Sequence, residues 1–81
     1  MSNKILIVED NDSLREMLVN IFKSLYTVIT AVNGKEGLEK TCSEMPHIVI
    51  SDIIMPEMSG TELCLAIKQN FDTCHIPVVL L

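Results

Sequence analysis

Three carboxylates occupy positions at which they could bind a metal ion together. Glu9 and Asp10 directly follow the apolar run 5–8, and Asp52 directly follows the segment 47–51, which is typical of a buried strand. If both runs are strands of an open parallel sheet, the chain leaves them at the edge where ligands bind. Two unit charges about 4 Å apart repel by roughly 4 kcal/mol at an effective dielectric near 20, so such a cluster predicts a bound cation. A small set of oxygen ligands with room for water and phosphate favours Mg²⁺.

The chemistry expected of this cluster is phosphoryl transfer to an aspartate. A cation would offset the carboxylate charge when an anionic phosphoryl donor approaches, and a carboxylate that attacks phosphorus forms an acyl phosphate. A simpler interpretation is also open: Glu9, Asp10 and Asp12 could cap a helix and interact with its positive end. Asp52 alone could be a turn residue. The combination is more specific than either part, because both acidic sites follow strands of the buried type.

The pattern of the whole chain predicts the elements that would hold these residues. Buried-type strands are expected at 5–8, 27–31, 47–51 and 78–81, and helices over 14–25, around 36–41 and over 61–69. Alternating strands and helices predict an α/β, doubly wound, flavodoxin-like parallel sheet with strand order 2-1-3-4 and right-handed crossovers. In that order the first and third strands are neighbours, so Glu9, Asp10 and Asp52 would converge.

Composition limits the class of protein. The 81 residues allow one domain, and 48% hydrophobic with 21% charged residues is typical of a globular chain. The formal net charge of −5 argues against binding to nucleic acid or to anionic lipid. No long apolar run or leader is present, so we expect no membrane contact and a cytoplasmic location. Cys42, Cys64 and Cys74 are expected to be small buried side chains without a disulfide or metal.

Two stretches carry a resemblance to a known family. The run Ile5-Leu6-Ile7-Val8-Glu9-Asp10-Asn11 and the run Asp52-Ile53-Ile54-Met55-Pro56-Glu57-Met58-Ser59-Gly60 resemble the CheY-like response-regulator receivers of two-component signalling. The resemblance covers the chain from Lys4 onward. It implies a signalling module that is not an enzyme, with a histidine kinase as its partner.

The resemblance also implies a role for each site residue. Asp52 would be the phosphoacceptor, and Glu9 and Asp10 would be the acidic pair that holds Mg²⁺ together with Asp52. Asp10 would be the more direct ligand, and the backbone carbonyl of Ile54 would complete the metal site. In the family, the side chain at the position of Ile54 helps to orient the water that removes the phosphoryl group. An apolar residue there implies slow dephosphorylation.

Some parts of the family's pattern are expected to be missing from residues 1–81. The family has a Ser or Thr after the fourth strand, and a Lys and an aromatic residue associated with a fifth strand. The sequence reaches Leu81 within the expected fourth strand, so we expect an incomplete receiver domain without the fifth strand and the last helices. The fourth strand would then be an apolar edge, through which the chain could self-associate.

Two alternatives differ from this interpretation. A phosphatase of the haloacid-dehalogenase type also uses an aspartate nucleophile with Mg²⁺, and Asp10-Asn11-Asp12 matches its Asp-x-Asp pattern weakly. The aspartate that becomes phosphorylated would distinguish the two. The second alternative is a self-associating fragment that does not accept phosphate.

Overall fold

The computed structural model describes residues 3–81, and its elements alternate between strand and helix along the chain. The strands are β1 (Asn3–Val8), β2 (Tyr26–Ala31), β3 (Ile48–Ser51) and β4 (Val78–Leu80). The helices are α1 (Asp12–Phe22), α2 (Gly34–Glu44) and α3 (Gly60–Gln69). All strand pairs are parallel, and the order across the sheet is β2-β1-β3-β4. The predicted α/β class and strand order are confirmed.

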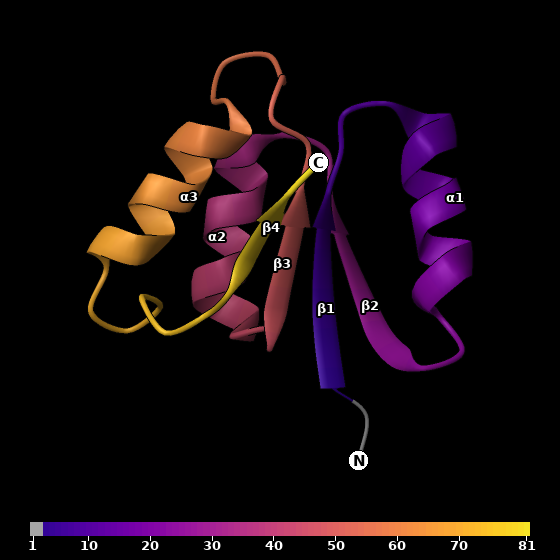
Figure 1. The fold of residues 1–81 in the computed structure, drawn as a ribbon, viewed down its shortest axis with the longest axis horizontal. Coiled ribbons are helices and arrows are strands. Elements are labelled where there is room, and N and C mark those ends of the chain that lie inside the picture. Colours follow the sequence, from indigo (N-terminus) through magenta and orange to yellow (C-terminus); the bar gives the residue numbers. More distant parts are fainter. Residues whose placement is uncertain (1–2) are drawn as a thin grey trace.

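The two faces of the sheet are covered by different helices (Figure 1). α2 and α3 pack together on one face, and α1 lies on the other. The main apolar cluster lies under α2 and α3 and consists of Leu6, Val8, Ala31, Val49, Met55, Leu63, Ile67 and Ile76. Alternate residues of β1 point to opposite faces, so Ile5 and Ile7 are buried on the α1 side. Most of the burial that holds the sheet therefore lies on the α2 and α3 face.

Local signals explain where the helices begin. The side chains of Asn11, Asn33 and Ser59 each accept a hydrogen bond from the backbone N–H three residues later, at the starts of α1, α2 and α3. Ser59 and Glu62 form a reciprocal capping box. α2 begins at Gly34 and ends at Glu44, so the helix expected around 36–41 is longer than predicted. An Asn-Gly pair is typical of a turn, but here Asn33 is the helix cap.

One further expectation is corrected by the structure. Cys42 and Cys74 are exposed and Cys64 is half-buried, so the cysteines are not buried apolar residues. No residue of α1 is fully buried, and its apolar side chains Leu14, Met17 and Ile21 are exposed. Among residues 3–81, no helix combines the length and the apolar composition needed to cross a membrane.

Candidate metal and phosphoacceptor site

The register of β1 and β3 brings the two acidic segments to one edge of the sheet. Val8 is paired with Ser51, the last residue of β3. The N–H of Asp52 donates to the carbonyl of Val8 at 3.2 Å and so extends the pairing by one residue. The chain then turns away from both strands at the same level. The residues that follow, Glu9 and Asp10 on one side and Asp52 on the other, are neighbours for this reason.

Asp52 is held by its own loop. Its Oδ1 accepts a hydrogen bond from the N–H of Ile53 at 2.9 Å, and its side chain is half-buried. The N–H of Gly60 donates to the carbonyl of Ile53 at 2.8 Å, which closes the loop between β3 and α3. A Cβ on Gly60 would overlap the carbonyl oxygen of Asp52. Only a residue without a side chain therefore allows α3 to start this close to the backbone of Asp52.

Glu9 is buried, whereas Asp10 is exposed. Glu9 has 1% of its surface exposed, and its N–H donates to the carbonyl of Ala31 at 3.0 Å. Its Oε2 accepts a hydrogen bond from the N–H of Asn11 at 3.2 Å. Its Oε1 has no hydrogen-bond partner among residues 3–81. A buried acceptor without a partner is costly, and its presence calls for an explanation such as a bound ion.

The three predicted carboxylates form one cluster. Glu9, Asp10 and Asp52 each offer an oxygen, and these oxygens lie within 4.8 Å of one another. Burial raises the pKa of Glu9, the N–H of Asn11 opposes this, and the neighbouring carboxylates of Asp10 and Asp52 raise the pKa further. The donor set of hard oxygens and the unpartnered Oε1 both fit a divalent cation such as Mg²⁺.

Ile54 lies on the loop beside this cluster, and its side chain is 84% exposed. The described contacts do not test whether its backbone carbonyl binds the ion, so that role stays a prediction. Asp12 does not lie in the cluster. Its carboxylate is 89% exposed and pairs with Arg15. The Asp-x-Asp interpretation, which needs Asp12 beside Asp10 as part of a phosphatase site, is disfavoured by this placement.

Sequence reasoning missed Arg15. This side chain bonds the backbone of Glu9 and the carboxylate of Asp12, as described below. The only signal in the sequence was the spacing of three residues between Asp12 and Arg15, which is common on helix surfaces. Its contact with Glu9 could not be predicted because it depends on the path of the loop.

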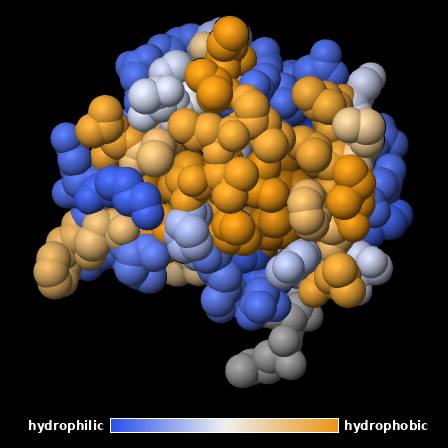
Figure 2. Space-filling model, in the orientation of Figure 1, coloured by the Kyte–Doolittle hydropathy of each residue, from blue (hydrophilic) through white to orange (hydrophobic). Residues whose placement is uncertain are grey.

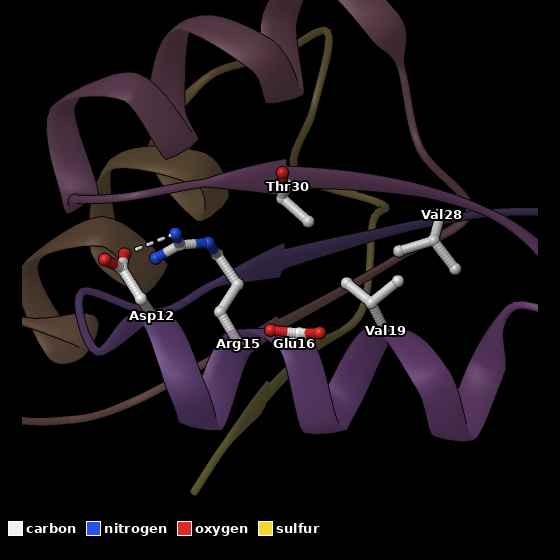
Figure 3. Close-up of a pocket in the computed structure, with 6 residues that line it drawn as sticks. All are labelled: Asp12, Arg15, Glu16, Val19, Val28 and Thr30. Carbon is white, nitrogen blue, oxygen red and sulfur yellow. Dashed lines mark hydrogen bonds and ion pairs between the residues drawn. The ribbon is translucent and has the colours of Figure 1, made fainter.

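A shallow groove lies next to the site but is separate from it (Figure 3). It runs between α1 and the outer strand β2 and has a volume of about 460 Å³. It is lined by Asp12, Arg15, Glu16, Val19, Val28 and Thr30. None of the three clustered carboxylates lines it, so the acidic cluster is an open surface at the strand ends rather than part of this groove.

Comparison with known proteins agrees with this geometry. Residues 5–81 match the model of the response regulator receiver domain. Histidine kinase P4 of Formosa agariphila is 52% identical over 77 residues, which are 95% of this chain and 6% of that protein. The transcriptional regulatory protein PhoP of Bacillus subtilis, named for alkaline phosphatase synthesis, is 39% identical over 86% of this chain and 30% of its own length. The chain thus spans a minor part of both relatives.

Solved structures give the same result for the fold. The receiver domain of a signal transduction histidine kinase from Syntrophus aciditrophicus is 38% identical with a TM-score of 0.93, and the match covers 99% of this chain and 61% of that one. The chemotaxis protein CheY4 of Vibrio cholerae is 31% identical with a TM-score of 0.91, over 99% of this chain and 68% of that one. The family model and these relatives show that this chain belongs to the response regulator receiver domain family.

Proposed function

We propose that this receiver takes a phosphoryl group on Asp52 from a phosphohistidine of a histidine kinase, in a reaction that depends on Mg²⁺. The family places the chain in phosphorelay signalling, in which receivers are signalling modules rather than enzymes. The observation that carries the finer proposal is the convergence of Glu9, Asp10 and Asp52 within 4.8 Å at the ends of β1 and β3. On family grounds we expect the reaction to take place in the cytoplasm.

The proposed transfer uses Asp52 as the nucleophile. One carboxylate oxygen of Asp52 attacks phosphorus, the bond between phosphorus and the histidine nitrogen breaks, and the electron pair stays on that nitrogen. The second ring nitrogen of the phosphohistidine carries a proton, so the imidazole leaves in its neutral form, and the phosphoryl group becomes an acyl phosphate on Asp52. The N–H of Ile53, which donates to Oδ1, holds the carboxylate in a defined orientation.

Glu9 and Asp10 would hold the ion together with Asp52. When bound, Mg²⁺ would neutralise charge on the carboxylates and on the transferring group. The protein's own contribution is positioning, which is the main requirement of phosphoryl transfer. The buried Glu9 has an oxygen without a partner among the described residues, and the exposed Asp10 leaves the site accessible to a large donor.

Labelling of Asp52 tests the proposal. Asp52→Asn keeps the acceptor for the Ile53 N–H but removes the nucleophilic carboxylate, so incorporation of label from a small phosphodonor such as acetyl phosphate should fall to background. The matched control is Asp12→Asn, which removes a carboxylate outside the cluster and should be labelled like the wild type. Label entering the Asp52→Asn variant at the wild-type level, or its loss in Asp12→Asn alone, would refute the assignment.

A further inference from the structure

Arg15 reaches back from α1 to the loop that carries the acidic pair. Its Nη1 donates to the backbone carbonyl of Glu9 at 2.9 Å, and its Nη2 pairs with Oδ1 of Asp12. Figure 3 shows the guanidinium turned toward Asp12 at one end of the groove. The Arg15 side chain is only 18% exposed, although the helix surface around it is open to solvent.

The stability of α1 does not account for this arrangement. A cation in the first turns of a helix faces the positive end of the helix dipole, which is unfavourable. Its ion pair with Asp12 involves a carboxylate that is 89% exposed, and such pairs typically contribute about 0–1 kcal/mol. The bond to the Glu9 carbonyl is the contact that needs Arg15 at this position.

The residues on both sides of Asp10 are fixed by hydrogen bonds. On one side, Glu9 is held through its N–H by Ala31 and through its carbonyl by Arg15. On the other side, Asn11 donates its N–H to Glu9 and caps α1 through its side chain. Asp10 itself is exposed and is repelled by the neighbouring carboxylates. Its position therefore depends on the peptide groups before and after it.

We propose that Arg15 is a positioning residue. It fixes the Glu9–Asp10 peptide so that the Asp10 carboxylate stays close enough to Glu9 and Asp52 for all three to bind the same ion. The inference rests on the proposed Mg²⁺-dependent function. The planar guanidinium offers two donors at a fixed angle, and one carbonyl and one carboxylate use them. A lysine would keep the charge, but its flexible ammonium lacks the rigid planar donor group that holds the Glu9 carbonyl in one orientation. Groups that orient metal ligands in this way typically change metal affinity about 10–100-fold when they are removed.

The test uses the whole protein, with three variants. Arg15→Ala and Arg15→Lys both remove the planar guanidinium. Asp12→Ala removes the ion pair with Arg15 but keeps the hydrogen bond from Arg15 to Glu9.

Mg²⁺ affinity is measured by calorimetric titration. Amide hydrogen exchange of Asp10 and Asn11 is measured without metal, and urea unfolding reports stability. We expect Mg²⁺ affinity to fall about tenfold in both Arg15 variants, with faster exchange at the two amides. Asp12→Ala should bind Mg²⁺ like the wild type.

The outcomes separate the inference from the proposed function. Wild-type affinity in Arg15→Lys would show that only the charge matters, and an equal loss in Asp12→Ala and Arg15→Ala would assign the effect to the ion pair. Reduced stability with unchanged affinity and exchange would show a merely structural role. Each of these results overturns the inference while the proposed function stands. If the wild type binds no Mg²⁺ at millimolar concentration, the proposed function fails and the inference fails with it.

Discussion

Glu9 is a buried carboxylate, and burial disfavours its charged form. Its side chain is 1% exposed, one of its oxygens has no partner among the described residues, and two other carboxylates lie within the same cluster. Burial, the first cause, raises the pKa of Glu9 above its ordinary value. A carboxyl group with a raised pKa in the folded state binds its proton more tightly there than in the unfolded chain. It therefore favours folding at low pH, and this contribution is lost as the pH rises through the folded-state pKa.

Glu9→Gln should remove this pH dependence. Without Mg²⁺, the wild-type free energy of unfolding should fall relative to Glu9→Gln as the pH rises from about 4 toward neutrality, because only the wild type must ionise a buried group. At neutral pH and without Mg²⁺, Glu9→Gln should be more stable than the wild type by roughly 1–3 kcal/mol, the range for an unsatisfied buried polar group. Urea unfolding over this pH range measures the difference. Parallel curves for the two proteins would contradict the prediction.

Ile54 is expected to lengthen the lifetime of the phosphorylated state. The family resemblance places its side chain where water is oriented for dephosphorylation, and the side chain is apolar and 84% exposed. Ile54→Asn and Ile54→Glu should shorten the half-life of the acyl phosphate several-fold, measured as loss of label over time. The control is Ile53→Asn, which makes the same kind of change at the exposed side chain next to Ile54 and keeps the backbone N–H that bonds Asp52. Equal half-lives in the wild type and both Ile54 variants would show that Ile54 does not govern hydrolysis.

At the level of single residues, the sequence predicted the site residues that directly follow strands. It did not predict contacts made by long side chains from elsewhere in the chain. Glu9, Asp10 and Asp52 could be assigned to one site because each follows a buried-type strand, and the strand order makes them neighbours. The contact from Arg15 to Glu9 has no periodic signal. The exposure of Cys42 was predicted wrongly because composition alone does not tell which side of a helix a small residue occupies.

Among the elements, the loop between β3 and α3 is the one most tightly tied to the site. Gly60 closes it through a bond to Ile53 and lies against the carbonyl of Asp52. Within the loop, Glu57 adopts a left-handed backbone with φ of 69°, and Met58 packs against Gly34 at the start of α2. The placement of Asp52 is therefore coupled to the starts of two helices.

Gly60→Ala should disturb both the fold and the site. The added methyl group has no room beside the Asp52 carbonyl, so the loop must shift, at a cost of about 1–3 kcal/mol. Urea unfolding measures the free energy of unfolding, and labelling measures phosphorylation of Asp52. Both quantities should be lower than in the wild type.

The matched control for Gly60 is Gly37→Ala. Gly37 is also buried, but the added methyl group would meet the side chains of Val8 and Leu63 rather than the site. This variant should lose stability while it keeps labelling once it is folded. Normal labelling in folded Gly60→Ala would show that the loop tolerates the shift without moving Asp52.

Element types were more predictable than element ends. The β-branched runs and the three-to-four residue spacing predicted all seven elements, because both patterns report burial directly. The start of α2 was placed too late, since Asn33-Gly34 is typical of a turn as well as of a helix cap. Only the packing of Gly34 against Met58 distinguishes the two, and that contact is tertiary.

On the scale of the whole molecule, the two faces of the sheet differ in how well they are covered. The face under α2 and α3 contains the buried cluster, whereas the α1 face leaves apolar side chains open to solvent. Figure 2 shows a broad hydrophobic area over the strands on the viewed side. Val78 of β4 packs against the buried cluster, so by strand alternation Val79 lies on the α1 side, where it is 41% exposed, and Leu81, directly after β4, is 56% exposed. β4 pairs only with β3 among the described strands.

We expect a polypeptide of residues 1–81 alone to self-associate rather than to be a stable monomer. The outer edge of β4 is short, apolar and uncharged, and such an edge tends to pair with another chain. Each large apolar side chain left in water forgoes roughly 1.5–3 kcal/mol, and a domain is typically stable by only about 5–15 kcal/mol. Several exposed side chains, among them Met17, Ile21 and Val79, are enough to decide the outcome.

Sedimentation velocity and far-ultraviolet circular dichroism on this polypeptide measure the association, and two lysine variants locate it. Val79→Lys places a charge on β4, and a loss of association that Leu25→Lys does not share would assign the contact to the β4 edge. Leu25→Lys changes a 73% exposed side chain just after α1, and should reduce association only if the α1 face is the contact. We expect the larger effect from Val79→Lys, because a strand edge also offers unpaired backbone groups. A monodisperse wild-type monomer that unfolds cooperatively would show that the four-stranded sheet is sufficient and would refute the prediction.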